Sequence, residues 1–207
     1  MMWKVCGMRD PRNIRDVMAL GPDYMGFIFY PPSPRCALGM PPELPSGVRG
    51  VGVFVNASAD EIAGICSRYG LETVQLHGDE SPDFCRTLSA TGLRVWKAIG
   101  LSDAPDWNQI RRYEECVDMF VFDTRSAARG GTGQKFNWNI LSDYPLSTPW
   151  LLSGGIGPDD TLPSLPGMAG VDINSRFEDA PGVKNVELIK EFIGNEQNRL
   201  AFCPKEQ

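Results

Sequence analysis

Short apolar runs recur along the chain, and most are followed by a turn and then by a segment with helical spacing of its apolar residues. The runs that we expect to form strands are Trp3–Cys6, Tyr24–Phe29, Gly50–Val55, Thr73–Leu76, Arg94–Lys97, Met119–Phe122, Trp150–Leu152 and Gly170–Ile173. Several of them are apolar throughout and rich in valine, isoleucine and phenylalanine, which is typical of strands buried on both faces. The pattern therefore predicts a parallel sheet in which strands alternate with helices.

The segments between these runs carry the helical patterns, in which apolar side chains recur every three or four residues. Such patterns cover Asp60–Tyr69, Asp83–Ser89, Trp107–Cys116 and Val186–Phe192. Ser58 and Ser81 precede the first two and are typical N-cap residues. The segment between Phe29 and Gly50 is rich in proline, so we expect the helix of this second unit to be short or absent.

An open doubly wound sheet and a closed barrel both fit strands that alternate with helices. Eight strand candidates, with no GxGxxG motif after the first one, favour the barrel. A length of 207 residues is near the lower limit for such a barrel. We therefore predict an α/β protein of the (β/α)8 TIM-barrel class, with a single domain over residues 1–197, a shortened second helix and a polar tail over residues 198–207.

The net charge and the cysteine content of the chain argue against several classes of function. The formal net charge of −6 argues against binding to nucleic acid or to an anionic membrane. No apolar stretch approaches the roughly 18 residues of a membrane span, and no secretion signal precedes the first strand. The six cysteines are widely spaced, with no CxxC pair, and there is a single histidine. We therefore expect reduced thiols, a cytoplasmic location and no zinc site.

Polar and reactive side chains gather just after the predicted strands. In a βα barrel the carboxyl ends of all strands open on one face, and that face carries the active site. In chain order the residues at these positions are Cys6, Arg35, Asn56, His77, Asp123, Ser153-Gly154-Gly155 and Asn174-Ser175. The sequence thus predicts that they share one site.

The loops after the seventh and eighth strands have the features of a phosphate site. The paired glycines Gly154 and Gly155 let backbone N–H groups approach a phosphate closely. Asn174 and Ser175 can add donors, often at the start of a short helix. The alternative is that each loop only turns the chain, but the two occur together where this fold usually binds phosphate.

Two of the residues could transfer protons. Asp123 ends a buried strand, where partial desolvation raises the pKa of a carboxyl group and suits it to donate a proton. The Cys6 thiol has an ordinary pKa near 8.5 and could act as a base if the site lowers it modestly. The structural alternatives are a turn aspartate and a small core cysteine.

Two further residues could bind a substrate. Arg35 lies on a loop stiffened by prolines, where a fixed guanidinium can hold a carboxylate bidentately, although it could also be a solvated surface arginine. His77 could donate a hydrogen bond to substrate or serve a structural role. Lys4 and Asp172 each lie two residues before a site residue, and the first and eighth strands of a barrel are neighbours. We therefore predict that Lys4 and Asp172 pair within about 6 Å.

Seven motifs, in order along the chain, resemble those of phosphoribosylanthranilate isomerases. The resemblance extends from residue 2 to about residue 193. They are Lys4-Val5-Cys6-Gly7, residues 26–35 (GFIFYPPSPR), Gly52-Val53-Phe54-Val55-Asn56, Val74-Gln75-Leu76-His77-Gly78, Phe122-Asp123-Thr124 with Gly130-Gly131-Thr132-Gly133, Leu152-Ser153-Gly154-Gly155-Ile156 and Gly170-Val171-Asp172. The resemblance implies a (β/α)8 barrel that catalyses an Amadori rearrangement in tryptophan biosynthesis without cofactor or metal.

By this resemblance Asp123 is the general acid and Cys6 the general base, while Arg35 holds the anthranilate carboxylate and His77 contacts the opened sugar. The phosphate would be held by the loops of Gly154, Gly155, Asn174 and Ser175. The partner is thus a small phosphorylated substrate, with a monomer or a homodimer as the assembly. The segment from Asn174 to Glu178 is bulkier than is common in the family, so Arg176 could either contact the phosphate or point to solvent.

Two rival interpretations remain at this point. Another phosphosugar isomerase with this barrel would use two carboxylates, and the thiol of Cys6 speaks against it. A non-catalytic barrel that binds a phosphorylated metabolite would need the phosphate loops but not both Cys6 and Asp123.

Overall fold

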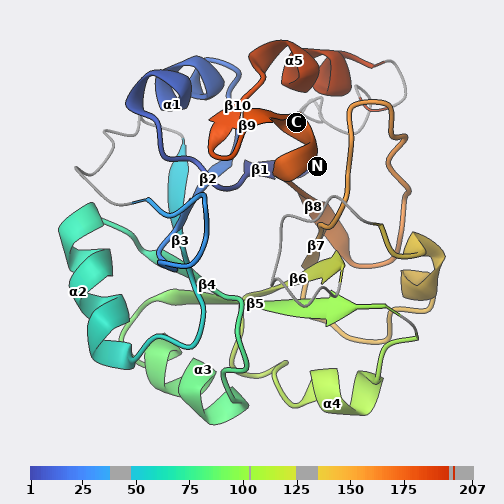
Figure 1. Ribbon diagram of the computed structural model, residues 1–207. Coiled ribbons are helices and arrows are strands. Elements are labelled where there is room, and N and C mark those ends of the chain that lie inside the picture. Colours follow the sequence, from blue (N-terminus) through green and yellow to red (C-terminus); the bar gives the residue numbers. More distant parts are fainter. Residues whose placement is uncertain (38–47, 103, 125–134, 196–197, 199–207) are drawn as a thin grey trace, which may run out of the picture.

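The computed structural model describes residues 1–37, 48–102, 104–124, 135–195 and 198. Eight parallel strands form a closed barrel in sequence order, and β8 returns to pair with β1 (Figure 1). They are β1 (Met2–Val5), β2 (Tyr24–Ile28), β3 (Arg49–Phe54), β4 (Thr73–Leu76), β5 (Arg94–Leu101), β6 (Met119–Thr124), β7 (Trp150–Leu152) and β8 (Met168–Ile173). All eight expected strands, and with them the predicted barrel class, are confirmed.

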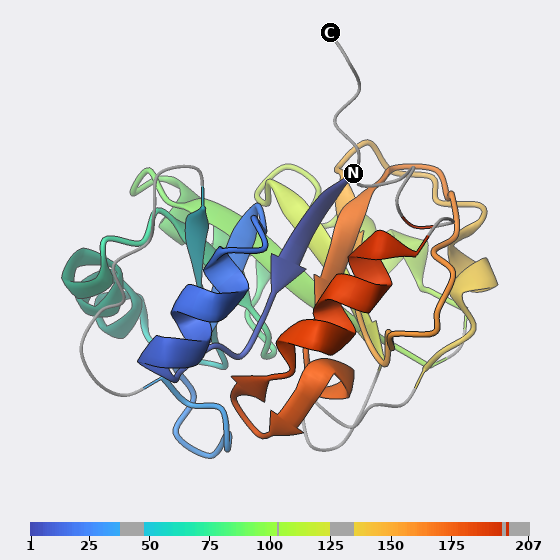
Figure 2. The ribbon, with the colours of Figure 1, turned by 90° about the horizontal axis from the view of Figure 1, so that it is seen from above.

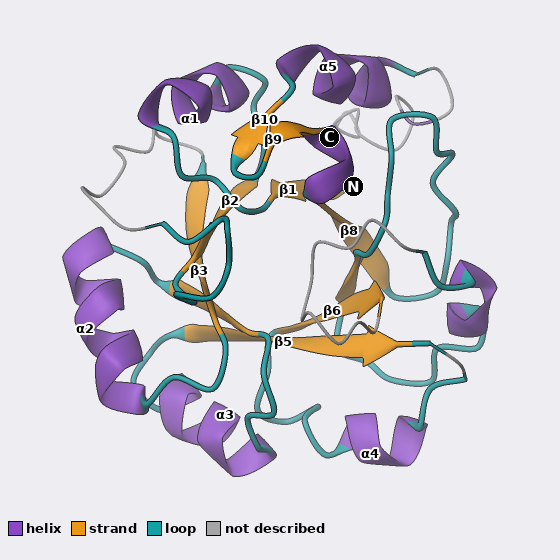
Figure 3. Cartoon of the chain, in the orientation of Figure 1, coloured by secondary structure: helices purple, strands orange, loops and turns teal. Residues whose placement is uncertain are grey.

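Helices surround the strand ring on its outer side (Figure 3). They are α1 (Pro11–Met18), α2 (Ala59–Tyr69), α3 (Pro82–Ser89), α4 (Trp107–Arg111) and α5 (Val186–Gly194), with short 3-10 turns η1 (Trp138–Leu141) and η2 (Ser175–Phe177). A small antiparallel hairpin, β9 (Glu178–Ala180) with β10 (Val183–Lys184), follows η2. Within the described ranges, no helix is long and apolar enough to cross a membrane.

Local signals explain where the helices begin. Ser58 forms a reciprocal capping box with Glu61 at the start of α2, and the Ser81 hydroxyl accepts from the Phe84 N–H at the start of α3. The helix α1 was not predicted, although Asp10 caps it ahead of a proline at its first position. The helix has only eight residues, and its few buried side chains form too short a pattern to reveal a helix in the sequence.

The helix expected over 107–116 is shorter than predicted. It ends at Arg111, because the chain then tightens into turns in which Tyr113 N–H donates to Ile110 C=O and Cys116 N–H donates to Tyr113 C=O. The short or absent second helix was expected between Phe29 and Gly50; residues 30–37 and 48–49 of that segment form no helix, and residues 38–47 lie outside the described residues.

The polar tail was expected to begin at Asn198, but this side chain is fully buried. It donates to the backbone carbonyls of Asp160 and Phe192 and accepts from the N–H of Leu162. Asn198 therefore packs with the barrel. Residues 199–207 lie outside the described residues, so the tail itself stays a prediction.

Two apolar clusters fill the molecule. The larger one lies between the strands and the helices, and the smaller one fills the barrel interior with side chains from β2, β3, β5, β6 and β7. The Tyr24 and Trp96 rings meet edge to face with centroids 4.8 Å apart, although β2 and β5 are not neighbours in the sheet. This contact therefore crosses the barrel interior, which is filled by apolar side chains. The polar residues of the predicted site lie at the carboxyl ends of the strands.

Candidate active site

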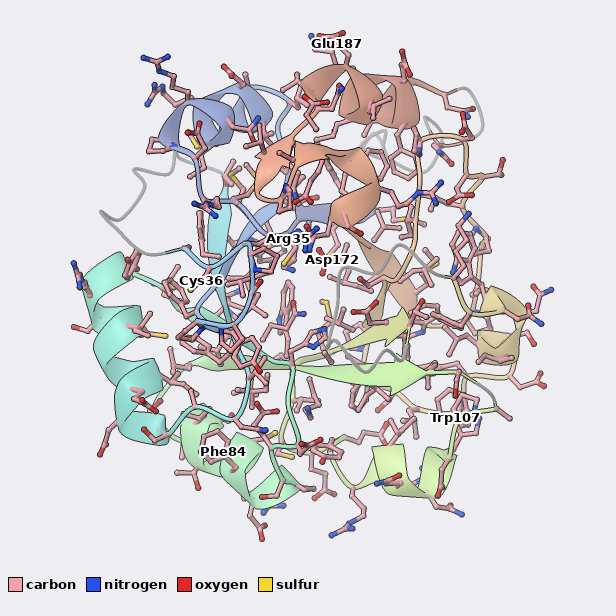
Figure 4. The ribbon with its side chains drawn as sticks, in the orientation of Figure 1. Arg35, Cys36, Phe84, Trp107, Asp172 and Glu187 are labelled. Atoms are coloured by element: carbon pink, nitrogen blue, oxygen red, sulfur yellow. The ribbon has the colours of Figure 1, made fainter. Side chains whose placement is uncertain are left out.

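The carboxyl ends of the strands open on the side of the barrel that also carries the β9–β10 hairpin and the loop after β2 (Figure 2). Arg35 and Asp172 both lie over the middle of the strand ring in Figure 4, whereas Phe84, Trp107 and Glu187 belong to the outer ring of helices. Cys6, His77 and Asp123 lie at the carboxyl ends of β1, β4 and β6, so the strand-end argument places them at the same mouth.

One side of the mouth holds a carboxyl–imidazole pair. The Asp123 Oδ2 atom lies 3.1 Å from His77 Nε2, and its Oδ1 atom accepts from the Thr124 N–H at 2.7 Å. Both side chains stay partly exposed, so a substrate can reach them. The lone histidine is therefore held by the predicted acid, a pairing that the sequence did not indicate.

The other side of the mouth holds the thiol. Cys6 directly follows β1 and is buried, with its backbone N–H donating to the Ile173 carbonyl of β8 at 2.9 Å. Lys4, two residues earlier, donates from Nζ to Asp172 Oδ2 at 2.8 Å. The predicted Lys4–Asp172 pair is therefore confirmed, and it is almost completely buried, with side chains 0% and 4% exposed.

Burial and charge act in opposite directions on these groups. Burial raises the pKa of the Cys6 thiol, and the Lys4 ammonium offsets part of that increase. Burial alone would lower the pKa of Lys4, but Asp172 and Cys6 together hold it above its usual value. Burial also raises the pKa of Asp172, against the opposing charge of Lys4.

Asp172 connects the two sides of the mouth electrostatically. The negative charge of Asp123 raises the pKa of Asp172 and a positive charge on His77 lowers it, while the negative charge of Asp172 in turn raises the pKa of Cys6. Its Oδ1 atom is buried and makes no hydrogen bond within the described part of the chain. Asp172 is therefore coupled by charge both to the Cys6 thiol and to the Asp123 carboxyl group.

Arg35 is fixed, as its proline-rich loop predicted, but by a residue that the sequence did not point to. Its Nε and Nη2 atoms donate to the Glu178 carboxylate at 2.9 and 2.7 Å, and its side chain is only 11% exposed. This geometry excludes a solvated surface arginine. The edge of the guanidinium formed by Nε and Nη2 is occupied by Glu178, and no hydrogen bond of Nη1 is seen within the described residues.

The β9–β10 hairpin supplies a second buried lysine. Lys184 Nζ donates to Glu178 Oε1 and, at 2.7 Å, to Asn174 Oδ1. Burial lowers the pKa of Lys184 despite the charge of Glu178. Burial alone would raise the pKa of Glu178, but its bonds with Arg35 and Lys184 hold it below the usual value.

The glycine pair after β7 has the backbone conformation that a phosphate loop needs. Gly154 and Gly155 have φ angles of 81° and 68°, in the left-handed region. A Cβ atom on Gly154 would lie 2.4 Å from the Thr124 nitrogen and 2.8 Å from Asp123 Oδ1. The loop therefore passes against the predicted acid, and only glycine fits there.

The loop after β8 is tied to the β9–β10 hairpin through Asn174. The Asn174 side chain makes no capping bond to η2 and instead accepts from Lys184. A phosphate binds to hydrogen-bond donors, so the occupied oxygen of Asn174 does not alter the prediction that N–H groups of Asn174 and Ser175 could hold it. Arg176 reaches the loop after β7, because a Cβ atom on Gly157 would lie 3.4 Å from its Nε and Nη2 atoms.

A buried ion pair supports the loop that carries His77. Lys97 Nζ lies 3.0 Å from Glu80 Oε2 and donates to the Gly78 carbonyl at 2.8 Å. Glu80 in turn accepts from the backbone N–H groups of Asn56 and Gly78. Asn56 is thus part of the scaffold beneath the site, and its φ of 53° is left-handed.

Comparison with known proteins decides the family. A sequence model described as N-(5'phosphoribosyl)anthranilate (PRA) isomerase matches residues 3–195. The chain belongs to this family.

A relative from Parabacteroides distasonis, named N-(5'-phosphoribosyl)anthranilate isomerase, is 43% identical over 203 residues, covering 93% of this chain and 92% of the relative. The crystal structure of phosphoribosyl anthranilate isomerase from Thermotoga maritima has a TM-score of 0.81 at 32% identity and covers 94% of this chain and 98% of its own. A third member was crystallised with reduced 1-(o-carboxyphenylamino)-1-deoxyribulose 5-phosphate, with a TM-score of 0.80, 30% identity and coverage of 96% and 98%.

Within this phosphoribosylanthranilate isomerase barrel, sequence reasoning missed Glu178 and Lys184. Both lie on the small hairpin after η2, whose only sequence signal is the turn Ala180-Pro181-Gly182. The glycine-rich segment 130–133, which we expected to cover a ligand, lies outside the described residues.

Proposed function

We propose that this chain isomerises N-(5'-phosphoribosyl)anthranilate to 1-(2-carboxyphenylamino)-1-deoxyribulose 5-phosphate, the Amadori step of tryptophan biosynthesis. The observation that carries the proposal is the position of the two groups in the closed barrel: Cys6 directly follows β1 and Asp123 lies at the end of β6, so both are at the carboxyl ends of strands, where this fold carries its active site. The reaction needs an acid and a base on one sugar, and it needs no cofactor.

Asp123 is the general acid in this proposal. It gives its proton to the furanose ring oxygen, the bond between that oxygen and C1 breaks, and the anthranilate nitrogen becomes a Schiff base. His77, 3.1 Å from Asp123, keeps the carboxyl group oriented and contacts the opened sugar.

Cys6 is the general base. Its thiolate takes the proton from C2, and the electron pair moves to the Schiff base to give an enolamine. The enol O–H then loses its proton while C1 gains one, which yields the ketone. Cys6 releases its proton and Asp123 takes one from solvent, so both groups are restored and the product is an isomer of the substrate.

The two anionic ends of the substrate need cationic or N–H partners. We assign the anthranilate carboxylate to the Nη1 side of Arg35, which Glu178 holds through Nε and Nη2. We assign the phosphate to the backbone N–H groups of Gly154, Gly155, Asn174 and Ser175. Arg176 lies close enough to this loop to add positive charge.

The proposal also covers assembly and location. We expect a cytoplasmic monomer or homodimer with no nucleic-acid partner.

The decisive experiment follows the loss of anthranilate fluorescence during turnover, with the substrate generated in situ. Turnover by the wild-type chain, abolished in Cys6→Ala, would support the proposal. Binding of the phosphorylated substrate without turnover would instead favour the non-catalytic barrel.

A further inference from the structure

One buried ammonium group lies beside the Cys6 thiol, and a second lies close to the peptide that follows it. A Cβ atom on Gly26 would lie 2.8 Å from Cys6 Sγ and 3.0 Å from Lys4 Nζ, so both atoms border the same small volume. Only a glycine at this position of β2 leaves room for the thiol and the ammonium to meet. Lys4 is fully buried, which weakens screening of its charge by water.

The second ammonium lies behind the chain segment that carries the thiol. A Cβ atom on Gly7 would lie 2.7 Å from Asn174 Oδ1, and the same oxygen accepts from Lys184 Nζ at 2.7 Å. Lys184 is therefore close to the Cys6-Gly7 peptide. Its positive charge lowers the pKa of Cys6, more weakly than that of Lys4 does.

The remaining charges around Cys6 oppose or balance these lysines. Asp172 on β8 pairs with Lys4 and destabilises a thiolate. Glu178 on β9 pairs with Lys184, and Arg35 from the loop after β2 pairs with Glu178. The His77–Asp123 pair acts on Asp172 from across the mouth.

We propose that Lys4, assisted by Lys184, is a positioning residue for Cys6. The buried Lys4 ammonium offsets the cost of burying the thiolate, and so it sets the fraction of protein molecules in which Cys6 is ionised and can act as the base. Asp172 limits that effect. The kinetic consequence rests on the proposed function, in which Cys6 is the base. The effect on thiol ionisation does not, because it is a property of the protein without substrate.

Three variants separate this role from a structural one. Lys4→Met keeps the length of the side chain and removes its charge, which should raise the midpoint of Cys6 ionisation by at least about one pH unit. Asp172→Asn keeps the shape of the side chain and removes the opposing charge, which should lower the midpoint. Loss of packing alone predicts no such opposite pair of shifts.

The midpoint is measured from ultraviolet thiolate absorbance as a function of pH, as the difference between each protein and the same protein carrying Cys6→Ala. Lys97→Met is the matched control, because it removes another buried, ion-paired lysine that is hydrogen-bonded to the loop after β4. It should leave the midpoint unchanged. If Lys4→Met does not fold, Lys4→Met/Asp172→Asn is compared with Asp172→Asn and should show the higher midpoint.

The proposal is overturned if the Lys4→Met midpoint equals that of the wild type, or if Lys4→Met and Asp172→Asn shift it in the same direction. The pH profile of kcat/KM is recorded in parallel, and its rising limb should move with the midpoint. A midpoint that moves without the rate profile would support the role of Lys4 and contradict Cys6 as the base.

Discussion

The Arg35–Glu178 contact gives a prediction that separates substrate binding from chemistry. Glu178 Oε2 accepts from Arg35 Nη2 at 2.7 Å, and Oε1 accepts from Lys184 and from the Gly182 N–H at 3.1 Å. In Glu178→Gln the amide oxygen can keep the latter two bonds. The amide NH2 group would then face Arg35 Nη2, donor against donor, and Arg35 would keep only the bond from Nε to the remaining oxygen, now 3.0 Å away.

The expected size follows from the bonds that are lost. A hydrogen bond to a charged group contributes about 1.5–3 kcal/mol, and only part of the Arg35 fixation is transmitted to a bound carboxylate. We expect KM to rise about tenfold, which corresponds to about 1.4 kcal/mol, while kcat changes less than about threefold. The proton-transfer groups are not touched, which is why kcat is spared.

Steady-state kinetics by the fluorescence assay measures both parameters. Glu187→Gln is the matched control, because it makes the same change on the exposed face of α5, where the carboxylate pairs only with Lys190 among the described contacts. A fall in kcat at constant KM in Glu178→Gln would refute the reasoning, since it would place Glu178 in the chemistry and not in carboxylate binding.

The same variant carries a pH signature in stability. The pKa of Glu178 is held below its usual value, so its ionised form stabilises the fold above the ordinary glutamate pKa of about 4.3. That stabilisation is lost as the pH falls through the lower folded-state value. The difference in unfolding free energy between the wild type and Glu178→Gln should therefore be largest near neutral pH and shrink below about pH 4.

Three further predictions concern other parts of the site and the scaffold. Cys6→Ala and Asp123→Asn should each lower kcat at least about a hundredfold with little change in KM, and near-normal turnover in either variant would reject its role. Gly154→Ala should destabilise the fold by about 1–3 kcal/mol in thermal unfolding, because its φ is 81° and the new Cβ would lie 2.4 Å from the Thr124 nitrogen; an unchanged melting temperature would contradict this. Ser58→Ala should lower the unfolding free energy by about 1 kcal/mol in urea titrations and leave kcat unchanged, since the hydrogen bonds that it removes join Ser58 to Glu61 and to none of the proposed substrate-binding groups.

The sequence predicted the strands well because their physical signal is strong. Strands buried on both faces must be apolar almost throughout, and runs such as Thr73–Leu76 and Trp150–Leu152 coincide with the observed strands. The Lys4–Asp172 pair could be predicted for a related reason. Strand parity and barrel closure together fix which side chains meet, without knowledge of any loop.

The parts that could not be predicted depend on long-range contacts of loops. Arg35 was expected at the site, but its partner Glu178 comes 143 residues later on a hairpin of five strand residues. The His77–Asp123 bond likewise joins the ends of β4 and β6, which are not adjacent strands. Side-chain pairing of this kind has no local pattern in the sequence.

The closure of β8 on β1 has a consequence for synthesis of the chain. The thiol near the amino terminus receives its charged neighbours from Asp172 and Lys184, which leave the ribosome much later. A nascent chain that lacks its final quarter therefore carries a Cys6 thiol without these charged neighbours, even if its first strands are already formed. The ionisation of Cys6 should thus indicate whether β8 has closed the barrel on β1. In a stalled or truncated chain, Cys6 should ionise like a cysteine in an unfolded peptide.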